Sequence, residues 1–280
     1  MATTTTAPPA ATQHAAERQP GAPRHAATAQ GGTPVHAAEP HPGAPPPAGA
    51  TTPGAIRAFG VMLGGPLVLL GAVAASAAHT VRALRRGRVP RPAAIGVLAC
   101  AAAYRRRLRP WMRTWGALDA EIEMELPGDE LSPHAPFAQT HAVEIDAPAD
   151  AVWAWVAQIG QDRGGFYSYT WLENLAGCGM RNADRIHREW QQRRVGETVL
   201  LHPASGLRIM RIEPGRALVL EGGWSLHVEP DGPGSCRLIA RFRAPAGLAG
   251  TAYALLLELP HFVMERRMLL QIKHRAEGRR

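Results

Sequence analysis

The sequence predicts an α+β domain in which one long C-terminal helix covers an antiparallel sheet, with a membrane-spanning helix ahead of the domain. Three observations support this prediction. Short stretches of alternating apolar and polar residues follow one another closely between 197 and 243, which is typical of an antiparallel meander. A helical pattern then fills 248–276. Residues 58–78 carry no charge and are long enough to cross a bilayer core of roughly 30 Å.

Composition divides the chain into four parts. Residues 1–55 are rich in Ala, Pro, Thr and Gly and have almost no large apolar side chain, so they cannot bury enough surface to offset their ordering entropy. We expect this tail to be disordered, and it lacks the charged start and apolar core of a secretory signal. The other parts are a transmembrane helix at 56–80, an Arg-rich juxtamembrane segment at 81–118 and a folded domain at 119–276.

The uncharged stretch 58–78 contains Gly and Pro, which are ordinary in a spanning helix, while a buried soluble helix is the alternative. Five Arg follow it between 82 and 91, against Arg57 alone before it. The positive-inside rule therefore predicts a single-pass protein of the cell membrane with its folded C-terminal domain in the cytoplasm. A second apolar run, 93–104, is short for a span and is expected to be interfacial or re-entrant. If it also spanned, the domain would face outside.

The net charge of +8 is unevenly distributed. Residues 57–118 contain eleven Arg and no acidic residue, and residues 1–56 are balanced, which leaves −3 for 119–280. A mildly acidic domain is unsuited to nucleic acid, so no nucleic-acid partner is expected. The arginines from Arg82 to Arg113 lie beside the apolar segments, which is typical of side chains that contact anionic lipid.

Neither a metal site nor a cofactor is predicted. Three widely spaced cysteines, Cys100, Cys178 and Cys236, form no CxxC pair, and the histidines outside the tail show no HxH or HExxH spacing. No phosphate loop, serine elbow or dinucleotide fingerprint is present.

The folded domain is expected to begin with a strand at 138–145, in which His141, Val143 and Ile145 alternate with Ala142 and Glu144. Asp146 and Pro148 then mark the start of a helix. Its apolar residues follow at i, i+3, i+4 and i+7, namely Val152, Trp155, Val156 and Ile159. Thr170 and Glu173 have the spacing of a capping box, so a second short helix is predicted to begin there.

Five strands are expected next, at 197–202, 207–212, 217–221, 224–229 and 236–243. The closing helix at 248–276 is expected to be kinked by Pro260. Its predicted apolar face consists of Leu255, Leu259, Phe262, Val263, Leu269 and Ile272. An apolar sheet face needs a cover, and this helix is the only element long enough to supply it. A curved sheet on one helix usually leaves an apolar cavity between the two.

This order of elements resembles the helix-grip fold of the SRPBCC superfamily, which includes START lipid carriers and polyketide cyclase/dehydrase-like proteins. Three stretches support the resemblance: 147–153 (Ala-Pro-Ala-Asp-Ala-Val-Trp), 158–187 with its Gly-Gly-Phe-Tyr-Ser-Tyr core, and 260–270. It covers roughly residues 110–276 and is specific for the fold rather than for function. The resemblance implies a curved sheet of about six strands wrapped on the C-terminal helix, with a cavity for an apolar or amphipathic ligand. It implies no shared catalytic residue.

Two sets of side chains are candidates for a site in that cavity. The ligand-binding candidates are Phe166, Tyr167, Tyr169, Trp171, Trp224, Leu259 and Phe262. The alternative for those at 167–171 is that they fix a helix corner by packing. Asp184 and His187 are the weaker candidates for acid–base catalysis, since a carboxylate beside an imidazole in a dry pocket can move a proton. Their alternative is a surface salt-bridge cluster with Arg181 and Arg188.

The expected function is therefore a membrane-anchored domain that binds a hydrophobic small molecule or lipid in the cavity between sheet and helix. One alternative is a polyketide cyclase or dehydratase-like enzyme that uses the same cavity, with Asp184, His187 or a Tyr moving a proton. Another is a non-catalytic interaction module whose cavity is filled by its own side chains. An open apolar pocket would favour the ligand-binding domain. An open pocket with a buried polar group would favour the enzyme, and a filled interior would favour the interaction module.

Overall fold

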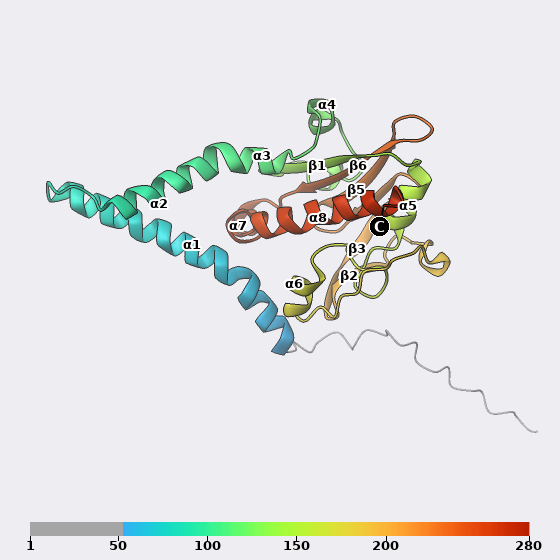
Figure 1. Ribbon diagram of the computed structural model, residues 1–280, viewed down its shortest axis with the longest axis horizontal. Coiled ribbons are helices and arrows are strands. Elements are labelled where there is room, and N and C mark those ends of the chain that lie inside the picture. The colour runs from blue at the N-terminus through green and yellow to red at the C-terminus, as the bar shows by residue number, and fades with distance from the viewer. Residues whose placement is uncertain (1–52, 280) are drawn as a thin grey trace, which may run out of the picture. The chain divides into compact units, whose positions relative to one another are not determined.

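A computed structural model describes residues 53–279 (Figure 1). The N-terminal tail expected to be disordered lies outside the described residues up to position 52.

Two helices precede the sheet and pack against each other: α1 (Pro53–Arg85) and α2 (Pro92–Ala103). α2 continues through a π-helical turn, η1 (Tyr104–Leu108), into α3 (Arg109–Arg113). Within the described residues, two helices are long and apolar enough to cross a membrane. The first, Gly64–Arg85, agrees with the apolar helix that the composition predicts. The second, Gly247–Ala276, is the C-terminal helix of the folded domain.

The sheet has six strands, and every neighbouring pair is antiparallel. The strands are β1 (Ala138–Ile145), β2 (Thr198–His202), β3 (Ser205–Glu213), β4 (Ala217–Leu220), β5 (Trp224–Pro230) and β6 (Cys236–Arg243). Their order is β1-β6-β5-β4-β3-β2, so the last five form a meander and β1 adds to the edge of β6. The sheet is open, since β1 and β2 are at opposite edges. The predicted α+β class is confirmed at this level.

One face of the sheet is covered by the C-terminal helix, which runs through α7 (Gly247–Ala252), η4 (Tyr253–Leu257) and α8 (Glu258–Ala276) (Figure 1). α8 contacts β1, β6 and the first domain helix, α5 (Ala149–Ala157). The shorter elements are α4 (Asp119–Glu123), η2 (Asp129–Leu131), α6 (Thr170–Leu175) and η3 (Arg188–Trp190).

A kink was predicted at Pro260, and the structure has a π-helical turn just ahead of this residue. Pro260 has no N–H to donate to the carbonyl four residues earlier. In η4 the pattern shifts to i→i+5 bonding, so that Glu258 N–H donates to Tyr253 O.

The apolar face predicted for this helix is only partly correct. Phe262, Leu269 and Ile272 are buried against the sheet, whereas Leu255, Leu259 and Val263 are exposed. Along an α-helix, Val263 lies about 100° from Phe262, so both cannot face the sheet squarely. The π-helical turn also shifts the register of residues before Glu258, which the sequence pattern could not reveal.

The capping box predicted at Thr170 is absent. α6 begins at Thr170, its N-cap is Tyr169, and no side chain caps it. The Thr170 hydroxyl instead accepts a hydrogen bond from Asn182 Nδ2 at 2.9 Å. Glu173, the expected partner, is buried in the domain.

Candidate functional site

A buried polar cluster lies between α8 and the sheet, centred on the carboxylate of Glu265. Both Glu265 on α8 and His141 on β1 are buried, and Glu265 Oε2 is hydrogen bonded to His141 Nδ1. Glu265 Oε1 accepts a hydrogen bond from Trp224 Nε1 at 2.6 Å and lies 3.3 Å from His261 Nε2. The carboxylate therefore has partners on two different strands and on its own helix.

The hydrogen-bond partners of His141 fix one of its protons. His141 Nε2 lies 2.7 Å from the carbonyl oxygen of Met112, and a carbonyl can only accept, so Nε2 carries a hydrogen. Burial raises the pKa of Glu265, but the charges of His261 and His141 and their hydrogen bonds outweigh it, and the pKa lies below its usual range. Glu265 is therefore an ionised carboxylate held between two imidazoles.

The cluster extends toward the surface through His261 to Tyr253 on η4. The Tyr253 hydroxyl is hydrogen bonded to His261 Nδ1 and lies 3.3 Å from Gln139 Oε1. Because ionised Glu265 only accepts, His261 carries a hydrogen on Nε2 and donates it to the carboxylate. The Tyr253 hydroxyl donates its own hydrogen to Gln139 Oε1. Burial, followed by the charges of Glu265 and Glu258, raises the pKa of Tyr253, which stays a neutral phenol. The His261 side chain is 20% exposed, against 1% for Glu265, so this is the open end.

Aromatic rings enclose the cluster. The Phe262 ring packs edge-on against His141 at 5.4 Å, and Phe242 stacks on Tyr253 at 4.4 Å between centroids. Further ring pairs are Phe262 with Trp111 and Trp115, Trp224 with Phe166 and His261, and Tyr253 with Phe137. The surroundings of the buried carboxylate are thus mainly aromatic.

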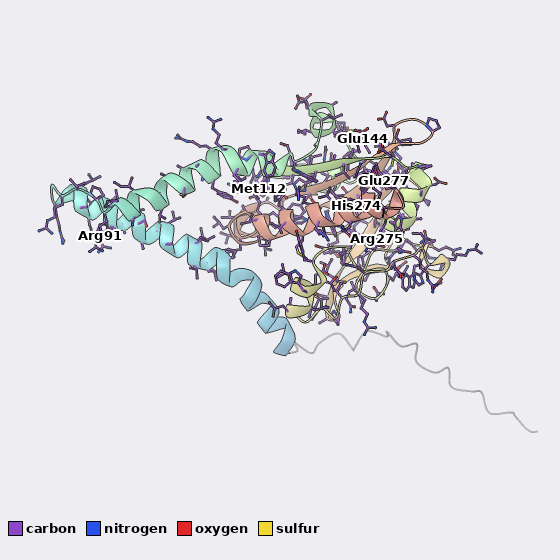
Figure 2. All side chains as sticks on the ribbon, in the orientation of Figure 1. Arg91, Met112, Glu144, His274, Arg275 and Glu277 are labelled. Atoms are coloured by element: carbon purple, nitrogen blue, oxygen red, sulfur yellow. The ribbon has the colours of Figure 1, made fainter. Side chains whose placement is uncertain are left out.

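A second ionic cluster joins α3 to the start of α8. Glu258 is buried and pairs with Arg109 at 2.6 Å and with Arg113 at 2.7 Å. Burial raises the pKa of Glu258, but the two guanidinium groups lower it below the usual carboxyl value. Met112, between these arginines, is buried and supplies the carbonyl to His141 (Figure 2). Residues 109–113, which precede the domain boundary predicted at 119, therefore pack against α8 and β1.

The sequence-predicted ligand-binding residues divide into three groups. Phe166, Trp224 and Phe262 lie in the aromatic surroundings of Glu265. Tyr167 is fully buried at φ 55°, and its hydroxyl accepts from Gln158 Nε2 at 3.0 Å, as expected of a residue that fixes a corner. The third group faces outward: Tyr169 is half-buried, Leu259 is exposed and Trp171 is 69% exposed.

Asp184 and His187 have separate surroundings. His187 pairs with Glu189 at 3.1 Å and stacks on Trp190, with ring centroids 4.0 Å apart. Asp184 is exposed at an open surface hollow of about 680 Å³, which is also lined by Gln271, His274, Arg275 and Arg279 at the end of α8 (Figure 2). The hollow begins several residues along α8 from Glu265.

The interface between α8 and the sheet is filled by side chains. Met268, Leu269 and Ile272 belong to one continuous buried cluster with Leu226 and Leu238 of the sheet. Across the described residues, no group of three or more His, Cys, Asp or Glu is arranged to hold a metal ion. His141 and His261 are each hydrogen bonded to Glu265.

His141, His261 and Glu265 were not predicted as site residues from the sequence. One signal was available: Glu265 lies between Phe262 and Leu269 on the sheet-facing side of the helix, and His261 precedes it by four residues. A charged residue within an apolar face must have a buried partner. No family model, curated protein or solved structure matches the chain.

Proposed function

We propose that the protein is a membrane-anchored helix-grip protein of the SRPBCC type, which binds a hydrophobic small molecule or lipid between the start of α8 and the sheet. The six-stranded antiparallel sheet and its long C-terminal helix are compatible with that fold. The apolar helix Gly64–Arg85 supplies the anchor.

The observation that best supports a site at this place is the buried Glu265 cluster within a ring of aromatic side chains. Replacing a buried ion pair by apolar residues is often neutral or stabilising, so stability alone gives little reason to keep one. Aromatic walls with a few convergent polar groups are the composition of small-molecule sites. The network formed by Glu265, His141 and His261 would fix the polar end of a ligand.

Side chains such as Phe262 and Tyr253 occupy the space around Glu265, and this packing by itself favours the filled interaction module. Binding as proposed here requires a ligand to displace these side chains. The π-helical turn η4 lies directly before α8 and carries Tyr253. Such turns interrupt the regular helical ladder and occur frequently at functional sites. Opening therefore requires movement at η4 rather than unfolding of α8.

Native mass spectrometry of the full chain extracted from its own membranes tests this proposal. We expect a bound apolar molecule on the wild-type chain and its loss from a Glu265→Gln variant. A Glu173→Gln variant is the matched control, since Glu173 is also a buried carboxylate but lies on α6. Wild-type chain that carries no ligand under conditions that preserve lipid contacts would favour the filled interaction module.

An enzyme is the second candidate, and the chain of hydrogen bonds from Tyr253 through His261 to Glu265 favours it. A phenol at the open end could donate its proton to an oxygen of the bound molecule, and a His261 imidazolium would then return a proton to the phenolate from Nδ1, while its Nε2–H stays on Glu265. Once a substrate has been identified, Tyr253→Phe and His261→Ala should each lower its turnover rate by at least about tenfold. The same assay on Asp184→Asn and His187→Ala tests the pair that the sequence offers as weaker catalytic candidates.

We further propose a single-pass topology in the cell membrane with the folded domain in the cytoplasm and with anionic lipid near Arg82 to Arg113. The arginines after the apolar part of α1 support this orientation. A reporter fused after Arg280 should be active only in its cytoplasmic form. Activity of a reporter that works only outside the cytoplasm would show that α2 crosses the membrane as well.

A further inference from the structure

The first half of the C-terminal helix carries apolar side chains that the rest of the domain leaves uncovered. They are Leu248, Leu255, Leu259 and Val263, here named the outer stripe, and their exposure ranges from 39% for Leu259 to 89% for Leu248. The last three are spaced four residues apart, so they follow one side of the helix. A run of this kind on a soluble surface marks a contact with a partner or a membrane.

The outer stripe lies in a segment without an exposed charge. Residues 247–263 contain one Asp, Glu, Lys or Arg, and that residue, Glu258, is buried against α3. The character of the surface changes at Arg266 and Arg267, which are both exposed. The helix is therefore apolar on its open side up to Val263 and basic from Arg266 onward.

Amphipathic side chains mark the same boundary. The Arg266 guanidinium lies over the Trp115 ring at 4.8 Å, and that of Arg267 lies over Tyr169 at 5.5 Å. Trp171, two residues after Tyr169, is among the most exposed large side chains of the described residues. Trp, Tyr and Arg at the edge of an apolar surface are typical of the interface between membrane and water.

The outer stripe also adjoins the candidate membrane span. α1 contacts η4, the turn that carries Leu255 (Figure 1). The helix 247–276 itself satisfies the length and hydropathy expected of a span, with only 22% of its most apolar window buried. A lipid environment around α1 would therefore extend to the stripe.

We propose that the outer stripe lies in the lipid bilayer beside α1, with Arg266 and Arg267 at the level of anionic headgroups. The domain is then seated on the membrane by its own surface rather than suspended from α1 alone. This inference builds on the proposed anchoring of α1, and it assigns to Trp171 a contact with the membrane interface in place of a role in ligand binding.

Spin labels on the full chain in vesicles of neutral and anionic phospholipid test the inference. Single cysteines replace Leu255, Leu259 or Val263 in a Cys100→Ser background. The two native thiols left are poorly reactive near neutral pH, because burial raises the pKa of Cys178 and Cys236 to about 11. Collisions with oxygen, which concentrates in lipid, are compared with collisions with a water-soluble nickel chelate.

Three further labels serve as references. Leu69 on α1 reports the anchor, while Val195 and Met210 are exposed apolar residues on the β2–β3 side of the domain. We expect the labels on the stripe to give the high oxygen-to-nickel ratio of Leu69, and the labels at Val195 and Met210 to give the low ratio of a water-exposed site.

Each alternative outcome has a distinct signature. Stripe labels that match Val195 while Leu69 is in lipid would overturn the inference and leave the anchor intact. Labels shielded from both reagents would overturn it in favour of a second copy or a protein partner. Labels on the outer stripe in lipid, together with a water-exposed label at Leu69, would support the contact between the stripe and the bilayer and would show that α1 is not the anchor.

Discussion

Glu173 offers a direct test of the electrostatics of the domain. It lies on α6, is only 8% exposed, and its Oε2 has no hydrogen-bond partner among the described residues. Burial raises the pKa of Glu173 from 4.5 to about 7. At about 1.4 kcal/mol for each pKa unit, this rise corresponds to at most about 3.5 kcal/mol, and partial exposure lowers the destabilisation by ionised Glu173 to about 3 kcal/mol.

The sign of the pH dependence follows from the raised pKa. Below about pH 4.5 the carboxyl is neutral in both states and has no destabilising effect. As pH rises toward about 7, the unfolded chain ionises first, and the stability that the neutral carboxyl provides is lost. Above about pH 7 the loss is complete. Glu173→Gln removes this titration, so its advantage over wild type should grow from near zero at about pH 4.5 to about 3 kcal/mol at about pH 8.

Denaturant unfolding of the full chain in detergent micelles, followed at several pH values, measures this difference. Glu189→Gln is the control, because Glu189 is exposed on the surface of the same region. Its difference from wild type should stay within about 0.5 kcal/mol. A Glu173→Gln variant whose advantage is the same at about pH 5 and about pH 8 would refute the reasoning.

Two substitutions with matched controls test the packing described above by the same unfolding assay. Phe262→Ala should lower the free energy of unfolding by about 3–5 kcal/mol. Val263→Ala, on the exposed side of α8, should change it by less than about 0.5 kcal/mol. A loss for Phe262→Ala as small as that for Val263→Ala would place Phe262 outside the core. Gly116 has φ +72°, and an added Cβ would lie 2.1 Å from the carbonyl oxygen of Ala142, so Gly116→Ala should destabilise strongly. At Gly196, which has φ +86° and no atom within 4 Å of an added Cβ, substitution by Ala should cost only about 1–2 kcal/mol of backbone strain. Equal losses of stability for Gly116→Ala and Gly196→Ala would contradict the close contact at Gly116.

Much of the architecture is readable in the sequence because it depends on local periodicity. Alternation places the strands within a few residues of β2 to β6, and the apolar spacing from Val152 to Ile159 places α5. The capping box predicted at Thr170 is wrong because the Thr170 hydroxyl accepts a hydrogen bond from Asn182, twelve residues along the chain. A bond of that kind depends on the tertiary fold.

The polar cluster could not be assembled from the sequence for a similar reason. His261 and Glu265 are neighbours on one helix, but His141 reaches them from a strand more than a hundred residues earlier. Trp224 was predicted as a ligand-binding residue from its place on an apolar strand face, with no sign that its indole N–H would bond a carboxylate. Asp184 and His187 were grouped because they are close in sequence, yet His187 pairs with Glu189.

The ionic bonds between α3 and α8 have a mechanical consequence. Arg109 and Arg113 pair with Glu258, and the Met112 carbonyl accepts a hydrogen bond from His141, so α3 is fixed both to α8 and to β1. If a ligand binds as proposed above and lifts the start of α8, it must either move α3 as well or break both ion pairs. The ion pairs make α3 a rigid connection to α8 and not a flexible linker. Under that proposal, ligand binding and the tilt of α3 are coupled, and a pair of spin labels on α3 and on the sheet would record the coupling as a distance that changes on binding.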